Sequence, residues 1–433
     1  MKNIANSFYY NPKYKRSLQW FKLIAMTGVA QVLIQALGLI SGILIVRLLP
    51  TKEYAFYTIA NTMLGTITLL ADGGISNGVI SQGGKVWNDK RKLGSVIVTG
   101  LDLRKKFAVV GLLVVTPLLM FLLKHNGASW LMCILIILSL IPAFLAALSD
   151  SLLEVAPKLL QDIKNLQKNQ VSANVGRFIM LGIFLFLFPW TYIAILASGI
   201  PRIYANMRLR KISSKYADFD EQPDPQVRKE ILVLVKRILP GAIYYCFSAQ
   251  ITIWLISIVG STTAIARVGA LGRLTMVLSL FSVMFTTLIS PRFARLPNNP
   301  DILLSRFVQI QLGLLLLSGI VIVCVWIFSS QLLWILGKSY SNLQHEILLN
   351  MIGACLTLIS GCAYSLYTYR GWSINPLISI PIDFAGILVA VLLINVSTVI
   401  GVFLFNIFVA SVQVLLHGSF CLIKIKGIKY EGG

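Results

Sequence analysis

The chain has 433 residues, of which 57% are hydrophobic and only 12% are charged, about half the charged share of an average soluble protein. This composition excludes a soluble globular protein, a disordered chain and a disulfide-rich secreted scaffold. The formal net charge of +22 would suggest nucleic-acid binding in a soluble protein, but membrane proteins also collect Lys and Arg on their cytoplasmic side. We therefore expect membrane lipids, and no nucleic acid, as partners.

Twelve apolar runs are long enough to cross a bilayer, for which a helix needs about 20 apolar residues. Six of them, bounded by charges, Pro or Asn-Gly, lie in the first half at 23–46, 55–81, 106–123, 129–149, 171–188 and 190–207. Six more follow at 238–260, 266–290, 307–328, 347–368, 376–395 and 397–421. The pattern predicts an all-α integral membrane protein with twelve transmembrane helices.

The distribution of basic residues tests this topology independently. With the N-terminus placed inside, 30 of the 38 Lys and Arg residues fall on the inner tails and connections, and only 5 on the outer connections. Cytoplasmic loops of membrane proteins carry such an excess. A single missed helix would invert every later loop, so the asymmetry predicts that both termini are cytoplasmic.

The longest connection, at about 208–237, divides the twelve spans into six and six. It predicts an N-terminal lobe of residues 1–215 and a C-terminal lobe of residues 216–433. The stretch from Val227 to Leu239 mixes basic and apolar residues at helical spacing. It either lies along the inner membrane surface or extends the following helix past the bilayer.

The sequence contains no recognisable catalytic pattern. Its three His residues have no ligand or triad partner at a meaningful spacing, and it has no P-loop. The six Cys residues lie in or beside apolar runs without a CxxC pair, which predicts neither disulfides nor metal ligands. The first 22 residues lack the apolar core of a signal peptide. We expect no enzymatic activity, no cofactor and no metal.

The candidate site consists of ionisable residues within or at the ends of the spans. Such groups are costly in hydrocarbon and usually face a bundle interior or a water-filled cavity. The six candidates for a substrate cavity are Arg47, Asp72, Arg177, Arg202, Arg273 and Asp383.

Other arrangements of these candidates remain open. Arg47 and Arg202 lie close enough to a membrane face for their heads to reach water. Arg177 could form a salt bridge with Asp72 or Asp383. Even so, with Arg267 included, five cations accompany two carboxylates in or at the ends of the spans. This excess favours an anionic cargo, and guanidinium groups match phosphate oxygens bidentately.

Several segments resemble the Wzx-type flippases, a polysaccharide transporter family of the multidrug/oligosaccharidyl-lipid/polysaccharide (MOP) superfamily. The similar segments are Gly38–Ile40, Val46–Pro50, Glu53–Tyr57, Leu70–Ile75, Arg267–Leu274 and Leu288–Arg292. Leu49 and Ala55 stand where the family has glycines. Arg47, Asp72 and Arg273 match family-like positions, whereas Arg177, Arg202 and Asp383 rest on the cost of burying charge.

The resemblance implies two six-helix lobes around a cationic cavity that opens alternately to either side of the bacterial inner membrane. The implied cargo is an oligosaccharide repeat unit on undecaprenyl pyrophosphate, destined for O-antigen, capsule or exopolysaccharide, with the polymerase machinery as a further partner. Two alternatives remain: a MATE-like drug or cation antiporter, and a non-transporting membrane component or polymerase of polysaccharide assembly.

Overall fold

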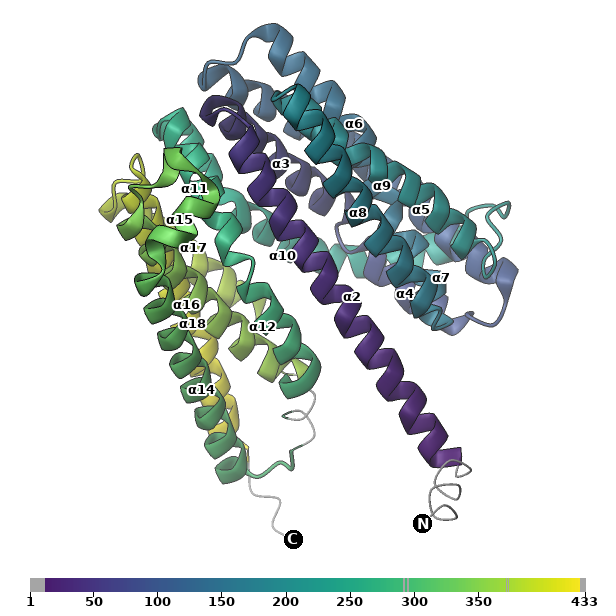
Figure 1. The fold of residues 1–433 in the computed structure, drawn as a ribbon. Helices are drawn as coiled ribbons and strands as arrows, with labels where there is room; N and C mark the ends of the chain where they lie inside the picture. The colour runs from purple at the N-terminus through teal and green to yellow at the C-terminus, as the bar shows by residue number, and fades with distance from the viewer. Residues whose placement is uncertain (1–11, 291–292, 294–295, 371, 373, 429–433) are drawn as a thin grey trace, which may run out of the picture.

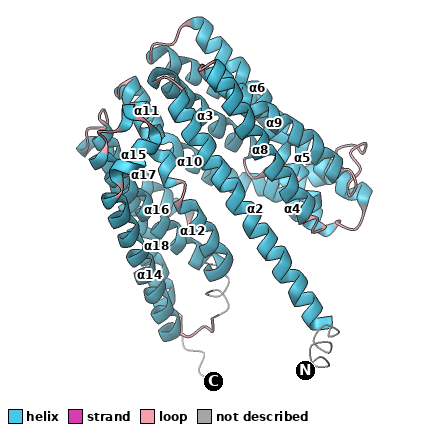
Figure 2. Cartoon of the chain, viewed as in Figure 1, coloured by secondary structure: helices cyan, strands magenta, loops and turns pink. Residues whose placement is uncertain are grey.

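The computed structural model describes residues 12–290, 293, 296–370, 372 and 374–428. In this part of the chain every regular element is a helix, and Figure 2 shows no strand. The predicted all-α class is confirmed.

The helices run back and forth along one common direction in Figure 1. Those before the longest connection are α2 (Pro12–Leu48), α3 (Thr51–Asp72), α4 (Ile75–Lys85), α5 (Lys90–His125), α6 (Trp130–Leu153), α7 (Val155–Leu159), α8 (Ile163–Leu187) and α9 (Thr191–Ser213). Those after it are α10 (Pro225–Val259), α11 (Thr262–Thr275), α12 (Leu278–Met284), the π-helix η1 (Phe285–Ile289), α14 (Pro300–Ile327), α15 (Ser329–Leu336), the 3-10 helix η2 (Lys338–Tyr340), α16 (Gln344–Tyr369), α17 (Pro376–Leu393) and α18 (Val399–Lys426).

Eight of the described helices are long and apolar enough to cross a membrane, or ten if the bent pairs α3–α4 and α11–α12 each form one span. The helices α9 and α10 occupy the two remaining predicted ranges. Every predicted span therefore coincides with a helix or a bent pair, and the total of twelve crossings stays a prediction.

The helices form two bundles (Figure 1). In the N-terminal bundle α2 packs on α8, α3 on α5, and α6 and α8 on α9, whereas in the C-terminal bundle α16 packs on α14 and α18, and α17 on α18. The helix α10 is continuous, and it contacts α3, α4 and α5 of the N-terminal bundle. The stretch from Val227 to Leu239 is thus part of a helix, and the predicted lobe boundary stays a prediction.

A sharp bend separates α3 from α4. The two axes differ by 43°, and Gly73 and Gly74 at the bend have φ angles of 48° and 94°. Side chains disfavour this left-handed region, whereas glycine enters it at no steric cost. The break places Asp72 at the last position of α3, where its carboxylate meets neighbouring helices.

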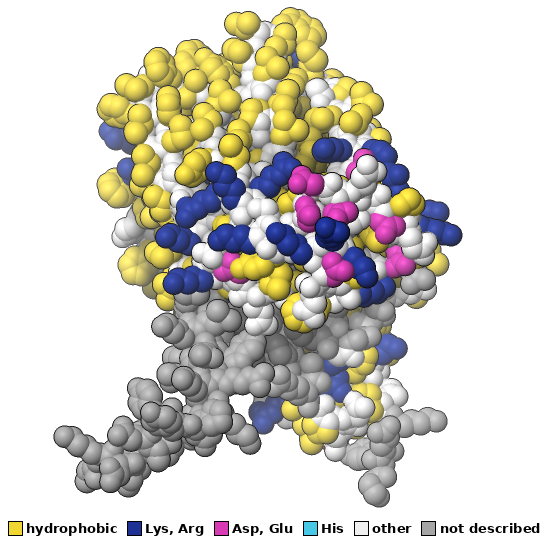
Figure 3. Space-filling model, turned by 90° about the vertical axis from the view of Figure 1, so that its right-hand side faces the viewer, with side chains coloured by type: hydrophobic (Ala, Val, Ile, Leu, Met, Phe, Trp, Pro, Cys, Tyr) yellow, Lys and Arg dark blue, Asp and Glu magenta, His cyan; other side chains and the backbone are white. Residues whose placement is uncertain are grey.

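Charge and apolar surface are separated along the molecule. Figure 3 shows an apolar face above a belt in which Lys and Arg alternate with Asp and Glu. Some charged side chains pair between elements, as Lys85 does with Glu230 at 3.4 Å and Arg91 with Glu221 at 3.9 Å. The beginning of α2 and the end of α18 lie toward the same end of the molecule (Figure 1), and the apolar face fits the predicted multi-pass membrane protein.

At the opposite end, which we call the far end, Arg47 joins the two bundles. Its Nε donates to the Ile335 carbonyl at 2.7 Å and its Nη2 to the Trp334 carbonyl at 2.6 Å. Its guanidinium also lies 5.0 Å from the centre of the Trp334 ring. Carbonyls in the last turn of a helix lack their usual intrahelical partner, so Arg47 of α2 completes the end of α15.

The end of α10 is completed in the same way. The Nδ2 of Asn126 donates to the Ser257 carbonyl at 3.0 Å, and the Nε2 of His125 lies 2.8 Å from the Ile258 carbonyl. Together with the Arg47 contacts, these bonds form what we call the far-end clasp. Arg47 thus caps α15 of the C-terminal bundle. His125 and Asn126 cap the end of α10, after which the chain continues into α11.

We expect Arg47→Ala to loosen the far-end clasp. Its hydrogen bonds are solvent-exposed, so a loss of about 1 kcal/mol is expected, or about a fivefold shift toward far-end opening. The measurement is labelling of a Leu336→Cys variant by a membrane-impermeant thiol reagent, because Leu336 is fully buried in the closed arrangement. Lys338→Ala, which removes a neighbouring charge outside the clasp, is the control, and equal labelling in both variants would contradict the clasp.

Candidate functional site

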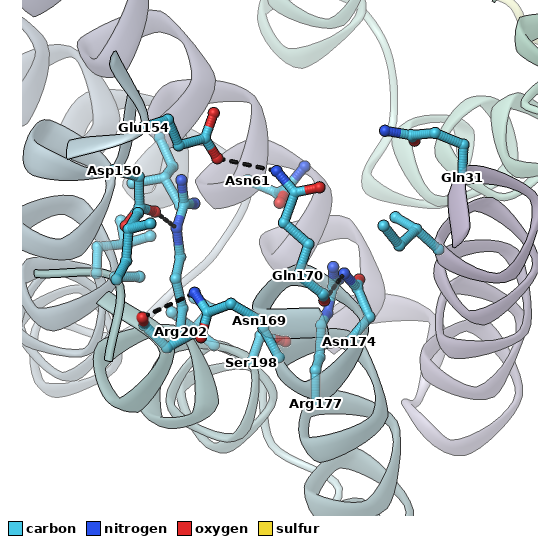
Figure 4. A pocket seen from close by; sticks show the side chains of 18 of the residues that line it. Gln31, Asn61, Asp150, Glu154, Asn169, Gln170, Asn174, Arg177, Ser198 and Arg202 are labelled. Atoms are coloured by element: carbon cyan, nitrogen blue, oxygen red, sulfur yellow. Dashed lines mark hydrogen bonds and ion pairs between the residues drawn. The ribbon is translucent and has the colours of Figure 1, made fainter. Parts of the chain in front are cut away.

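A polar pocket of about 460 Å³ lies among α2, α3, α6, α8 and α9. Figure 4 shows its polar side chains converging from these helices. The polar lining consists of Gln31, Tyr57, Asn61, Asp150, Glu154, Asn169, Gln170, Asn174, Arg177, Ser198 and Arg202. Polar and charged groups are expensive inside a membrane-embedded bundle, so such a gathering marks a functional site.

Arg177 projects into this pocket from α8 (Figure 4). It is half-buried, and its buried Nε has no hydrogen-bond partner among the described residues. The carboxylates that line the pocket with it have other cations: Asp150 pairs with Arg202, and Glu154 with Lys158. Arg177 therefore presents an uncompensated positive charge to the pocket.

Arg202 extends into the pocket from α9, and one part of its guanidinium is bound by a carboxylate of the protein. Its Nε donates to Oδ2 of Asp150 at 2.8 Å, and Asn206 donates to the other oxygen, Oδ1, at 2.6 Å. Asp150 thus occupies one edge of the guanidinium. A guanidinium carries five N–H donors, and the terminal nitrogens of Arg202 remain for a ligand.

The second carboxylate of the pocket, Glu154, is also compensated. Lys158 lies 2.7 Å from its Oε2, and the Gln170 amide donates to its Oε1 at 2.9 Å. The pocket therefore holds two guanidinium groups and two carboxylates. Each carboxylate has its own cationic partner, so the charge left over is that of Arg177.

The structure places Asp72 outside this pocket, in a buried cluster. Its Oδ1 accepts from the buried Arg104 and from the Ser76 hydroxyl at 2.6 Å. Asp72 thus pairs with Arg104 rather than with Arg177. Arg104 falls between the apolar runs at 55–81 and 106–123 and was therefore counted among the basic residues of the inner connections, but the structure places it within α5, where it is 3% exposed.

Asp383 lies on α17 in the C-terminal bundle, also away from the pocket. It is buried beside Tyr244 of α10, and its Oδ1 has no hydrogen-bond partner among the described residues. The alternative of an Asp383–Arg177 salt bridge does not occur among the described residues.

Arg273 touches the pocket indirectly. It extends from α11 to α2, where a Cβ at Gly42 would lie 3.0 Å from its Cδ, so a side chain at this position would force Arg273 to shift. Its guanidinium lies 5.9 Å from the centre of the Tyr57 ring, and Tyr57 also lines the pocket.

Of the six predicted site residues, the structure brings only Arg177 and Arg202 together in the pocket. Arg273 lies behind its Tyr57 wall, and Arg47 belongs to the far-end clasp. Asp72 and Asp383 lie away from the pocket.

Sequence reasoning missed most of the polar lining. Asp150 and Glu154 were assigned to an inner connection, yet Asp150 belongs to α6 and Glu154 follows its last residue. Helix α8 contributes five residues to the pocket lining, namely Asn169, Gln170, Ala173, Asn174 and Arg177. Along the helix they recur at intervals of three to four residues. This is the spacing of one helix face, and it is the signal that could have revealed the pocket. Within the described residues no cluster of His, Cys, Asp and Glu could hold a metal ion.

Known structures share this fold. An inward-facing multidrug resistance MATE family transporter of the MOP superfamily is 16% identical, with a TM-score of 0.70 over 92% of this chain and 96% of its own. The lipid II flippase MurJ in an inward closed conformation is 14% identical, with a TM-score of 0.70 over 93% of this chain and 87% of its own. An outward-facing MATE transporter is 15% identical, with a TM-score of 0.60 over 93% of this chain and 94% of its own.

These likenesses define the fold as that of MATE and MurJ transporters, and they confirm the predicted fold class. No family model and no curated relative matches the chain.

We expect Arg177 and Arg104 to differ in their contributions to stability. Replacing Arg104 by Gln leaves the partly buried Asp72 without its cation, which costs up to about 3 kcal/mol. Arg177→Gln removes a charge without a partner, so the protein should be as stable as the wild type or more so. Thermal unfolding of the purified variants in one detergent checks this, and an equal loss in both would show that Arg177 has a structural role.

Proposed function

We propose that the protein is a flippase that moves an oligosaccharide linked to undecaprenyl pyrophosphate from the cytoplasmic to the outer leaflet of a bacterial inner membrane. The observation that carries the proposal is the uncompensated guanidinium of Arg177 in a polar pocket within a transporter fold. The resemblance to Wzx-type flippases and the structural likeness to a lipid II flippase support the same cargo class.

The pocket suits both parts of such a headgroup. Arg177 and the free edge of Arg202 offer donors for phosphate oxygens, which guanidinium forks match bidentately. Asn61, Asn169, Asn174 and Gln31 offer amides to sugar hydroxyls. The volume of about 460 Å³ is that of an ordinary small-molecule site, enough for the pyrophosphate and the sugars next to it. The polyprenyl tail stays in lipid.

In this proposal, the remaining predicted residues contribute to the movement by which the pocket opens to one side of the membrane and then to the other. The far-end clasp, with Arg47, holds the outer side closed while the pocket is loaded from inside. Arg273 contacts both α2 and the Tyr57 wall of the pocket, so separation of the bundles at the far end exposes it to the cargo. Asp72 holds the bend between α3 and α4, and Asp383 belongs to the C-terminal bundle.

The membrane potential favours this direction of transport. One elementary charge crossing the field gains about 2.3 kcal/mol per 100 mV. Two negative charges that leave a negative interior therefore gain about 4.6 kcal/mol per 100 mV. Outward flipping of a pyrophosphate needs no ATP on this account, in agreement with a sequence that lacks a P-loop.

A MATE-like cation antiporter is the second candidate, and the carboxylates of Asp150 and Glu154 in the pocket favour it. A cationic drug needs an uncompensated carboxylate, however. Both carboxylates already hold a basic side chain, Arg202 and Lys158, so the pocket as folded favours an anion.

The test is transport of a fluorescent undecaprenyl-pyrophosphate-linked oligosaccharide in proteoliposomes with an imposed potential. Arg177→Gln and Arg202→Gln should each lower the transport rate at limiting substrate roughly 30-fold, since each removes a charged hydrogen-bonding partner worth about 2 kcal/mol. Arg210→Gln, which removes an exposed guanidinium from the end of α9 outside the pocket, is the matched control and should transport as the wild type does.

Three outcomes would contradict the proposal. Wild-type transport by Arg177→Gln would show that the pocket charge is not used. Uptake of cationic dyes that depends on Asp150 and Glu154 would instead support the antiporter. No transport by pure wild-type protein would support a non-transporting component of the assembly machinery, and elongation of the supplied oligosaccharide would indicate a polymerase.

A further inference from the structure

Four helices meet in a buried polar cluster around Arg104. Its Nη1 donates to the Leu148 carbonyl at 2.7 Å and to the Ser151 hydroxyl at 2.6 Å, both on α6. Its Nη2 pairs with Asp72 of α3 and donates to the Ser76 hydroxyl of α4 at 3.2 Å. A single guanidinium of α5 thus connects the bend between α3 and α4 with the last turns of α6.

The opposite side of the same α6 segment faces the pocket. Asp150 lies between Leu148 and Ser151 in sequence, and it holds Nε of Arg202 at 2.8 Å. Asn206 of α9 donates to the Ala146 carbonyl at 3.1 Å and to the Ser149 hydroxyl at 2.7 Å. Residues 146–151 are therefore held between Arg104 on one side and two residues of α9 on the other, the pocket residue Arg202 and its neighbour Asn206.

This segment lies where α6 passes into α7. Helix α6 stops at Leu153, and the short α7 begins at Val155 after the single residue Glu154. Glu154 keeps helical backbone angles, and its N–H donates to the Asp150 carbonyl at 3.0 Å, so the helical path continues through this point. Asp150 and Glu154, the two carboxylates of the pocket, sit at this end, so its position decides where Arg202 points.

We infer that Arg104 is a positioning residue for the substrate pocket, acting through α6 and Asp150 to orient Arg202. It does not line the pocket itself. Its buried pair with Asp72 fixes the guanidinium, and the two Nη1 bonds fix the turn that carries Asp150. The inference rests on the proposed function, since it assumes that Arg202 contacts the phosphorylated headgroup.

Three variants separate positioning from folding. Ser151→Ala removes one bond from Arg104 to α6 and leaves the ion pair intact. Asp72→Asn combined with Arg104→Gln removes both charges, so that no buried charge is left alone, and Arg104→Gln is the severe variant. Arg228→Gln is the matched control, because Arg228 pairs with Asp102 on the same helix α5 without touching α6.

The readout is transport in proteoliposomes as a function of the concentration of the undecaprenyl-pyrophosphate-linked probe, with the half-saturating concentration and the maximal rate measured separately. Ser151→Ala should raise the half-saturating concentration about threefold, and the neutral double variant about tenfold. The maximal rate per folded protein should fall less. The control should match the wild type in both.

A double-mutant cycle decides the route. Adding Ser151→Ala or the neutral double variant to Arg202→Gln should cause no further rise in the half-saturating concentration, because the group being oriented is already gone. When they are added to Arg177→Gln, the same changes should raise the half-saturating concentration by their own factor on top of the Arg177→Gln effect. If Arg104 had a merely structural role, its variants would lower protein abundance and maximal rate alike. Their effects would then multiply with those of Arg177→Gln and of Arg202→Gln.

The outcomes are distinguishable from a failure of the proposed function. If Arg177→Gln and Arg202→Gln transport the probe normally, the proposed function is wrong. If those two fail but the Arg104 variants keep a wild-type half-saturating concentration, or multiply with Arg202→Gln, the positioning inference is wrong. Should Arg104→Gln and the neutral double variant not fold, Ser151→Ala and its combination with Arg202→Gln decide alone.

Discussion

The structure depends on how each charge inside the N-terminal bundle is compensated. A charge in a low-dielectric interior is costly unless a partner and hydrogen bonds satisfy it. Asp72 has Arg104, Asp150 has Arg202 and Asn206, and Glu154 has Lys158 and Gln170. Arg177 stands apart from this set, since its buried Nε has no partner among the described residues. An arginine whose cost the protein does not offset internally is best explained by a ligand that offsets it.

The lining of the pocket comes from helices of the N-terminal bundle alone. In the proposed transport cycle, the binding site therefore stays intact while the two bundles change their relation. Helix α11 packs on α2 and α3 through apolar side chains, and polar contacts are added by Arg273 at Gly42 and the Tyr57 ring and by the far-end clasp. Contacts to helix-end carbonyls can be exchanged for water, which suits an interface that opens and closes.

The fold was largely predictable from the sequence, because apolar length and the distribution of Lys and Arg are local or additive signals. The site was only partly predictable. Arg177 and Arg202 stand out as charges within apolar runs, whereas Arg104 is followed by Lys105 and Lys106 and resembles a basic loop. On the helix these three point in different directions, so Lys105 and Lys106 are exposed while Arg104 is buried. Its partners lie 28 to 47 residues away in sequence, and no local pattern indicates such pairings.

The overall charge of the protein and the charge of its pocket have separate origins. The net charge of +22 gathers largely on tails and connections, such as the belt in Figure 3, where it orients the chain in the membrane. The pocket itself contains as many carboxylates as guanidinium groups. The anionic cargo that we propose therefore does not follow from composition or from a count of charged residues. It rests on which groups are paired: both carboxylates are engaged, Arg202 is shared with Asp150, and Arg177 has no partner among the described residues.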